Sequence, residues 1–380
     1  MNNLQRSEAP PKCNCLKRMA ILLLVLLLLA GALLGLDWLL SATLCRGGNW
    51  EGPHSDHFDG TRFHNPTPFI SYGRGSSLDW FLRSYQKGHY PEVSQNKHQP
   101  ELSRLVNGAD WECTLVNHST FLIRIGGMNI LTDPIWSDEP SPVANLGPSR
   151  KRPVGIPWEQ LPRIDVCLIS HDHYDHFDTD TLRRLKLRDD PLFIVPLGLK
   201  DLLEYHIGAA RIEEKDWWET CTHGSLSITL TPAQHWSARY RGEDARNRSL
   251  WCGFWVQAED GPSIYFSGDT AWADIFEQIH HRLGAPDLAI IPIGAYKPDW
   301  IRTAHLNPTD AVRAFRALKA RQGIGCHFGT WQMGYESYDE TLVDLATALL
   351  AAGVSPESFV AADNGQTLRG KATNHRHLSP

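Results

Sequence analysis

Hydrophobic residues gather first in one uninterrupted block near the amino terminus. From Met19 to Leu36 the chain has 18 consecutive uncharged residues, ten of them leucine. A helix of that length rises about 27 Å, close to the roughly 30 Å thickness of a hydrocarbon core. Asp37 ends the block and Trp38 follows, a pair suited to a membrane interface. The pattern predicts a transmembrane signal anchor within residues 19–45.

The residues that precede the block set its predicted orientation. Four of them are basic and only Glu8 is acidic; the basic ones are Arg6, Lys12, Lys17 and Arg18. By the positive-inside rule the amino terminus is cytoplasmic and the bulk of the chain lies on the opposite face, the periplasmic face of an inner membrane if the source is bacterial. A cleaved signal peptide is the alternative, although the block is long for one and no clean small-residue cleavage site follows.

After the block the pattern changes twice. Residues 46–107 are rich in Gly, Pro, His, Ser and Asn, which predicts an extended, loop-rich arm that packs on the following domain, with one short helix near Leu78–Ser84. Beyond it, strand-like runs are expected at 112–116, 121–125, 129–132, 166–170, 192–195, 226–231, 250–257, 263–267 and 288–292. Helical patterns are expected at 179–187, 198–206, 273–283, 308–321 and 338–352. Strands in hairpins followed by strands that alternate with helices favour two sheets with helices outside them.

The predicted organisation is therefore a short basic tail over 1–18, the anchor over 19–45, the arm over 46–107, one globular domain over 108–370 and a flexible tail over 371–380. Composition agrees with a folded domain, since 42% of residues are hydrophobic and 21% are charged. The formal net charge of −6 argues against a dedicated nucleic-acid binder.

One motif carries most of the chemistry. A buried strand ending at Ser170 runs directly into His171-Asp-His173-Tyr-Asp175-His176. Side chains two positions apart project to the same side of an extended segment. Three imidazoles and a carboxylate within six residues form a ligand set that suits Zn²⁺, which accepts nitrogen and oxygen donors. The alternative is a solvated histidine-rich loop.

Three further donors follow the ends of other predicted strands: His235, Asp269 and His327. Each is a weak signal alone, because an isolated His or Asp after a strand is often structural. Loops at strand ends are where a rigid scaffold presents functional side chains. Together with the first motif they make seven candidate ligands, enough for two metal ions.

The order of these donors resembles the metallo-β-lactamase superfamily. Longer strings resemble the N-acylphosphatidylethanolamine-hydrolysing phospholipase D family, from about Pro66 to Leu368; they include Leu131-Thr-Asp-Pro-Ile-Trp-Ser, Gln234-His-Trp, Ser267-Gly-Asp-Thr and Ala304-His-Leu-Asn-Pro-Thr-Asp. The resemblance implies a four-layer αβ/βα sandwich. It also implies two Zn²⁺ per chain, one held by His171, His173 and His235, the other by Asp175, His176 and His327, with Asp269 bridging both.

The family's activity is implied in the same way. It would make the chain a membrane-anchored, zinc-dependent phosphodiesterase that hydrolyses N-acylphosphatidylethanolamine to N-acylethanolamine and phosphatidic acid through a metal-bound hydroxide. Asp175, Asp269 and His305 are the expected catalytic residues, and Tyr174 and His305 are expected to contact substrate. The expected partners are a phospholipid substrate and the bilayer, without nucleic acid, and a homodimer stays open.

Several alternatives remain at this point. The same metal site would serve a lactonase or a small phosphodiesterase, and a non-catalytic metal or lipid binder is a further hypothesis. The arginines of the loop 239–248 would meet anionic headgroups or simply be solvated; they are Arg239, Arg241, Arg246 and Arg248. Trp217 and Trp218 are more typical of packing than of a lipid groove. Asp133, Asp172 and His118 are candidate partners of the ligands.

Overall fold

The computed structural model describes residues 15–43, 46–67, 87–239 and 245–372, apart from residues 94, 101, 103–105, 107, 109, 144 and 146. The helix predicted near Leu78–Ser84 lies outside these residues. Contacts divide the chain into two units, Met1–Arg46 and Gly47–Pro380.

The first unit holds helix α1, Cys15–Thr43, which covers the apolar block. Crossing a bilayer takes about 20 consecutive, predominantly apolar residues. Within the described residues no helix combines that length with that apolar character, so the transmembrane segment predicted over 19–45 is not supported.

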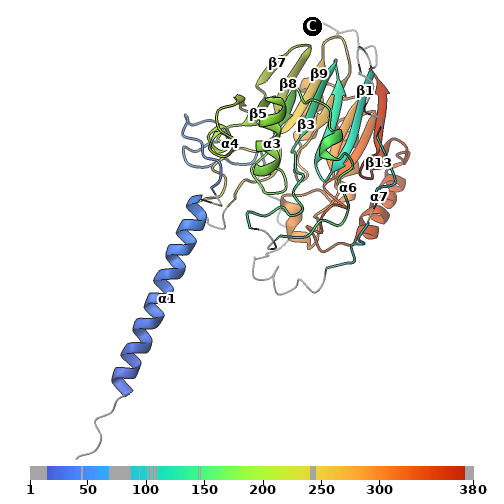
Figure 1. The fold of residues 1–380 in the computed structure, drawn as a ribbon. Helices are drawn as coiled ribbons and strands as arrows, with labels where there is room; N and C mark the ends of the chain where they lie inside the picture. The colour runs from blue at the N-terminus through green and yellow to red at the C-terminus, as the bar shows by residue number, and fades with distance from the viewer. Residues whose placement is uncertain are drawn as a thin grey trace, which may run out of the picture. The chain divides into compact units, whose positions relative to one another are not determined.

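The second unit contains two seven-stranded mixed sheets (Figure 1). The first has the order β14-β1-β2-β3-β4-β5-β6. Its strands are β1 Asp110–Asn117, β2 Thr120–Ile125, β3 Met128–Thr132, β4 Val166–Leu168, β5 Leu192–Pro196, β6 Arg211–Lys215 and β14 Thr367–Lys371. Hairpins link β1, β2 and β3, whereas β3 to β6 are parallel.

The second sheet has the order β13-β12-β11-β10-β9-β8-β7. Its strands are β7 Thr220–His223, β8 Leu226–Thr231, β9 Gly253–Ala258, β10 Ser263–Phe266, β11 Leu288–Pro292, β12 Gln322–Cys326 and β13 Phe359–Ala361. Here β7 to β10 are antiparallel and β10 to β13 are parallel. Each sheet thus joins a hairpin half to a parallel half.

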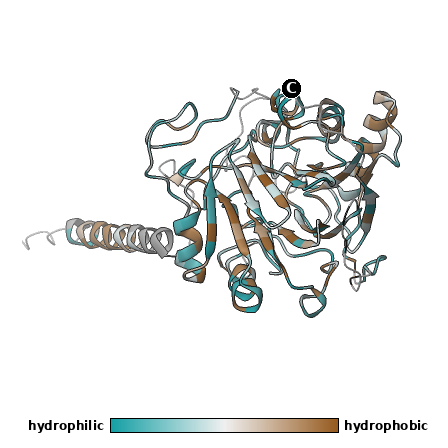
Figure 2. Ribbon diagram, turned by 90° about the horizontal axis from the view of Figure 1, so that it is seen from above, coloured by the Kyte–Doolittle hydropathy of each residue, from teal (hydrophilic) through white to brown (hydrophobic). Residues whose placement is uncertain are grey.

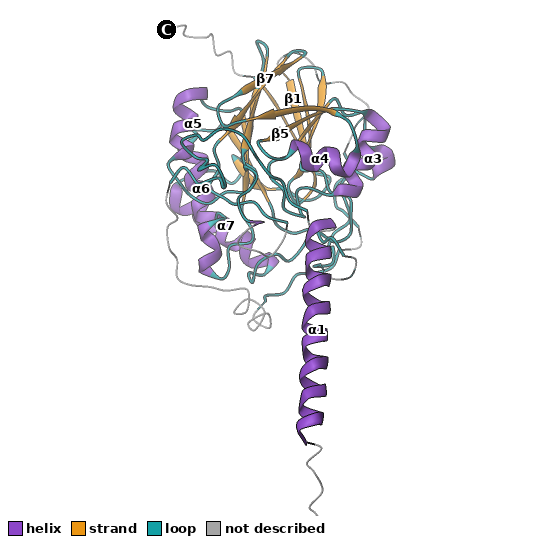
Figure 3. Cartoon of the chain, turned by 90° about the vertical axis from the view of Figure 1, so that its left-hand side faces the viewer, coloured by secondary structure: helices purple, strands orange, loops and turns teal. Residues whose placement is uncertain are grey.

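Helices cover the outer face of each sheet (Figure 3). The first sheet carries α3 Thr179–Asp189 and α4 Lys200–Ile207. The second carries α5 Ile275–Leu283, α6 Pro308–Ala317 and α7 Tyr338–Ala352. Two short 3₁₀ helices, Trp158–Gln160 and Asp299–Thr303, lie in loops. The predicted sandwich of two sheets with helices outside is confirmed.

Three hydrophobic cores hold these layers together. One lies between the sheets and includes Ile123, Phe254 and Ile290, all fully buried. The other two lie between each sheet and its own helices. Hydrophobic segments accordingly concentrate on the strands in the middle of the domain (Figure 2). Each large apolar side chain buried in this way contributes about 1.5–3 kcal/mol.

Some element boundaries differ from the sequence prediction. The strand expected over 250–257 begins only at Gly253, because the peptide N–H groups of Leu250 and Cys252 donate to Leu197 and Ser170 at the end of the other sheet. The helix expected over 308–321 ends at Ala317, and Lys319 has a left-handed backbone with φ of 52°. Strands β6, β7, β13 and β14 were not predicted; β6 and β7 are polar, and β13 has only three residues.

Candidate metal centre

The predicted metal motif forms a buried loop between β4 and α3. Its turn is closed by the N–H groups of His176 and Phe177, which both donate to the His173 carbonyl. The Asp178 side chain then caps α3 by accepting from the Asp180 N–H. The loop is therefore anchored to the first turn of α3. Its imidazoles and carboxylate lie at the carboxyl ends of the parallel strands.

Three histidines make the first cluster. His171 Nε2 lies 2.9 Å from His173 Nδ1, and His235 Nε2 lies 3.3 Å from the same atom. His171 and His235 are buried, and His173 is half-buried. These three ligand atoms all lie within 4.8 Å of one another. The structure therefore brings together the three residues predicted for one metal.

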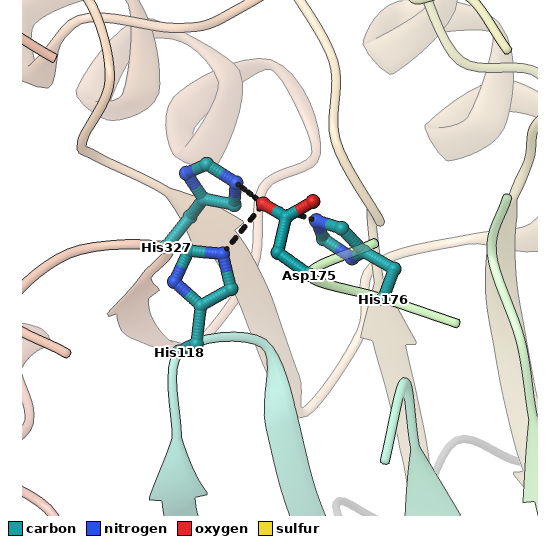
Figure 4. Close-up of side chains that lie close together, drawn as sticks. All are labelled: His118, Asp175, His176 and His327. Carbon is teal, nitrogen blue, oxygen red and sulfur yellow. Dashed lines mark hydrogen bonds and ion pairs between the residues drawn. The ribbon is translucent and has the colours of Figure 1, made fainter. Parts of the chain in front are cut away.

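The second cluster contains Asp175, His176 and His327, with His118 beside them (Figure 4). Asp175 Oδ2 lies 3.3 Å from His327 Nε2, 3.5 Å from His176 Nε2 and 3.0 Å from His118 Nε2. All four side chains are buried. The residues predicted for the second metal thus converge, and His118 adds a fourth buried group.

Asp269 lies between the two clusters. Its Oδ2 is 3.0 Å from His327 Nε2 and 3.3 Å from His176 Nε2 on one side, and 3.8 Å from His235 Nε2 on the other. Gly268 precedes it with φ of 59°, and a Cβ there would approach the Cys252 carbonyl to 2.6 Å. A glycine is required at this turn, which places the carboxylate where a bridging ligand would be.

The hydrogen bonds of three histidines fix their tautomers. The Ala304 carbonyl only accepts, so His235 Nδ1, 2.8 Å away, carries the proton and leaves Nε2 bare. His176 Nδ1 lies 2.7 Å from Asp133 Oδ2. Ser170 Oγ, itself bound to Asp133 Oδ2, lies 2.9 Å from His171 Nδ1. One carboxylate, Asp133, thus orients a ligand in each cluster, as outer residues of metal sites do.

The electrostatics of the cluster favour a cation. Burial lowers the pKa of His171 well below its ordinary value and lowers the pKa of His173 and of His235 to about 3, so these imidazoles are neutral at neutral pH. Burial also lowers the pKa of His327, but the carboxylates of Asp269 and Asp175 outweigh it and raise that pKa to about 9. The carboxylates therefore attract positive charge to this position, which a divalent metal ion would supply.

The donor set passes a further test for metal binding. Buried atoms without a hydrogen-bond partner in the described part of the chain include His176 Nε2, His327 Nε2 and Asp269 Oδ1. Buried polar atoms are normally satisfied, and unpaired ones need an explanation. Buried imidazole nitrogens and carboxylate oxygens that converge on two points without hydrogen-bond partners are consistent with a binuclear metal site.

Backbone strain coincides with this site. His118, Asp133 and His327 have left-handed backbones, with φ of 47°, 35° and 58°. Such conformations in non-glycine residues each cost of order 1–3 kcal/mol and persist where the surroundings fix them. The peptide N–H of His327 donates to the His118 carbonyl, which ties two of the strained residues together.

Comparison with known proteins agrees with this geometry. The model of the β-lactamase superfamily domain matches residues 128–328, more than half of the chain, a range that includes all seven candidate ligands. The chain is 37% identical over 266 residues to N-acyl-phosphatidylethanolamine-hydrolysing phospholipase D 1 of Caenorhabditis elegans, covering 67% of this chain and 74% of that one. The chain belongs to the N-acyl-phosphatidylethanolamine-hydrolysing phospholipase D family.

A mitochondrial member of this phospholipase D family from Saccharomyces cerevisiae is 35% identical over 221 residues, 56% of this chain and 46% of that one. Among solved structures, an isothiocyanate hydrolase from Delia radicum gut bacteria matches with a TM-score of 0.56 at 19% identity, over 69% of this chain and all of that one. A metallo hydrolase from Ignicoccus hospitalis matches with a TM-score of 0.52, also at 19% identity, over 70% of this chain and all of that one. The family member described here is a metal-dependent hydrolase with the metallo-β-lactamase fold.

Other predicted site residues lie around the clusters in different roles. His305 is half-buried, its Nδ1 is 3.8 Å from Asp269 Oδ2, and burial lowers its pKa to about 3. The Tyr174 hydroxyl donates to the Arg239 carbonyl at 2.9 Å, and the Arg239 guanidinium stacks 4.0 Å above the Tyr174 ring. Tyr174, itself part of the metal loop, therefore packs against Arg239, and its predicted contact with substrate stays a prediction.

Arg239 fits neither of the two roles that the sequence left open, a headgroup contact or a solvated side chain. Its side chain is buried and donates to the carbonyls of Asp172 and Phe177, so it stabilises the backbone of the metal loop. Arg246 stacks on Trp236 at the border of the site, while Arg241 lies outside the described residues. Asp172 accepts from the Gly48 N–H and the Ser249 hydroxyl, away from the ligands.

The two tryptophans pack as predicted. Trp217 is part of the core between the sheets, and its indole N–H donates to the Trp251 carbonyl. Trp218 is partly buried against the same core and lies under Arg282. The Ala304 carbonyl and the Asn65 amide contact His235 and were not predicted, because a backbone carbonyl and a lone asparagine carry no sequence signal for a metal site.

Proposed function

We propose that this chain is a dizinc phosphodiesterase that hydrolyses N-acylphosphatidylethanolamine to N-acylethanolamine and phosphatidic acid. The observation that carries the proposal is the convergence of all seven candidate ligands on two clusters joined by Asp269, in a chain of this family. His171, His173 and His235 would hold one ion, and Asp175, His176 and His327 the other. Two bound zinc ions would supply Lewis acidity and activate water for attack on phosphorus.

Residues around the candidate ligands hold the ligand side chains in fixed orientations. Asp133, Ser170 and the Ala304 carbonyl fix the rings of His171, His176 and His235. Preorganised groups of this kind need not rearrange during the reaction, which is the main source of electrostatic catalysis. The buried His118 ring holds Asp175 through the contact of its Nε2 with Asp175 Oδ2.

His305 is the residue best placed to contact the reacting group. It follows the 3₁₀ helix Asp299–Thr303 and precedes the cap of α6, so a short rigid loop presents it. Its ring centroid lies 5.1 Å from that of His235 and 5.3 Å from that of His327, one histidine of each cluster. A neutral imidazole there would donate its N–H to a phosphoryl oxygen or to the departing oxygen of the N-acylethanolamine.

The half-buried border of the site offers a surface for the rest of the lipid. The Trp236 ring lies 4.2 Å from the His173 ring, and the Arg246 guanidinium is 4.6 Å above Trp236. An aromatic wall beside the ligands and a cation beyond it suit an amphipathic substrate with a phosphate.

Substrate choice tests the proposal. Zinc-loaded full-length chain is given N-acylphosphatidylethanolamine, phosphatidylcholine or a lactone, each in mixed micelles, and products are measured by mass spectrometry. We expect phosphatidic acid and N-acylethanolamine from the first, with kcat/KM at least about tenfold above phosphatidylcholine. Turnover of a comparator without phosphatidic acid from the first substrate would reject the proposal.

The location of the chain, its association with a bilayer and its oligomeric state stay predictions of the sequence. The proposed chemistry depends only on residues of the second unit.

A further inference from the structure

A small hairpin in the segment that precedes the domain leads directly to the metal centre. Phe58 and Phe63 form an antiparallel bridge, and their rings lie 4.6 Å apart. Asp59 Oδ1 closes the turn by accepting from the N–H groups of Thr61 and Arg62. Both phenylalanines are buried in the core between the sheets, and the Phe63 N–H donates to the Asn247 carbonyl. The position of Asn65, two residues later, is therefore fixed by the domain core.

Asn65 pairs with both peptide groups of the candidate ligand His235. Its Oδ1 accepts from the His235 N–H at 2.8 Å, and its Nδ2 donates to the His235 carbonyl, also at 2.8 Å. Next to this pair, the Thr67 hydroxyl donates to Gln234 Oε1, and Gln234 Nε2 donates to the Thr67 carbonyl. Four hydrogen bonds thus join residues 65–67 to residues 234–235.

His235 needs such support because no strand holds it. Strand β8 ends at Thr231, four residues earlier, and His235 lies in irregular backbone. On the far side, the Gln234 peptide is bound to Thr270 and Ala271 next to Asp269. The His235 ring is held by the Ala304 carbonyl. Its backbone is held by Asn65. The Asn65 amide bonds the N–H and the carbonyl of His235, as a residue on a neighbouring strand would do.

We propose that Asn65 is a positioning residue for the three-histidine metal position and that the segment 47–67 is part of the metal centre. Asn65 lies before the residues 128–328 that match the superfamily domain and before the first strand of the sheets, β1, so this contribution comes from outside both. The inference rests on the proposed metal centre but not on the substrate. Asn65 touches no reacting atom; it acts by placing Nε2 of His235 beside His173.

Metal affinity tests this role without any turnover assay. In the full-length chain, Asn65→Ala is expected to weaken zinc binding at one of two positions by about 10–100-fold, the usual cost of removing a residue that orients a ligand. Zinc affinity is measured by competition with a chromophoric chelator. The visible spectrum of the Co²⁺-loaded chain is expected to change as well, because it reports the geometry around the metal.

Two further variants separate positioning from general stability. Asn65→Asp keeps the shape of the side chain but places a carboxylate oxygen, which cannot donate, beside the His235 carbonyl. It is therefore expected to weaken zinc binding at the same metal position. Asn96→Ala is the matched control: Asn96 is also half-buried, precedes the domain and donates to two backbone carbonyls, those of Pro153 and Val154, away from the metal clusters. It is expected to leave both zinc affinities and the Co²⁺ spectrum unchanged.

Wild-type affinity and an unchanged Co²⁺ spectrum in both Asn65 variants would overturn the inference, as would equal losses in Asn65→Ala and Asn96→Ala. Wild-type chain that binds no zinc would overturn the metal centre itself, and the first titration reveals this. A chain that binds two zinc ions but spares N-acylphosphatidylethanolamine rejects the proposed substrate and leaves the role of Asn65 supported if its variants behave as expected.

Discussion

Replacing Asp269 with alanine is expected to lower turnover by at least about 10³-fold, beyond the cost of losing a single preorganised contact. The same change is expected to reduce zinc from two ions per chain to one or fewer. Asp269 Oδ2 is the atom that approaches histidines of both clusters, at 3.0 Å from His327 and 3.8 Å from His235. Its loss removes a ligand from each metal position and also the negative charge that offsets two cations.

Asp287→Ala provides the matched control. Asp287 is also a buried carboxylate between β10 and β11, but it accepts from the Ser263 N–H and pairs with Arg321 at the opposite ends of these strands. Its removal should lower thermal stability while zinc content stays at two. Metal content is measured by plasma mass spectrometry and folding by circular dichroism. Two zinc ions and normal turnover in the folded Asp269→Ala chain would show that this carboxylate is not the bridge.

His305→Ala is expected to lower kcat by about 10²–10³-fold while both zinc ions remain bound, in the range found for removal of a group that donates or accepts a proton. The physical reason is position: the ring faces Asp269 and adjoins one histidine of each cluster. It is half-buried, whereas every candidate ligand except His173 is buried. His305→Gln keeps an N–H donor and is expected to recover part of the lost rate.

The control for this change is His280→Ala, a half-buried histidine on α5 outside the metal clusters. It should leave both kcat and zinc content unchanged. If His305→Ala instead loses one zinc ion, His305 is a metal ligand, which its grouping with His235 and Asp269 would allow. Unchanged kcat with two zinc ions would remove His305 from the reaction altogether.

The sequence predicted the metal residues because they lie next to local signals. His171 to His176 follow a buried strand directly, and Asp269 and His327 each end another, so the parallel strands bring them to one edge. The two-sheet architecture followed from strands in hairpins that give way to strands alternating with helices.

What the sequence did not predict depends on contacts between distant segments. The sequence left two roles open for Arg239, a headgroup contact or a solvated side chain, but the side chain is buried against the carbonyls of Asp172 and Phe177. The support that Asn65 gives His235 spans 170 residues and involves only backbone groups of the ligand. Neither leaves a periodic or spacing signal, because tertiary packing alone decides them.

The predicted strand boundaries were wrong for a related reason. Residues 250–252 look like the start of a long apolar strand, yet the N–H groups of Leu250 and Cys252 bond to the first sheet before β9 begins in the second. Strands β6 and β7 lack the apolar alternation typical of half-buried strands, since they lie at the edges of their sheets.

The most direct test of the central claim is the fate of the oxygen atom of water. The zinc-loaded chain hydrolyses N-acylphosphatidylethanolamine in ¹⁸O-water, and both products are analysed by mass spectrometry. Attack of water on phosphorus breaks the bond between phosphorus and the ethanolamine oxygen. The N-acylethanolamine therefore leaves with its original oxygen, and the oxygen of water stays on phosphorus. We predict one ¹⁸O atom in phosphatidic acid and none in N-acylethanolamine. Label in N-acylethanolamine, or no phosphatidic acid at all, would contradict the account.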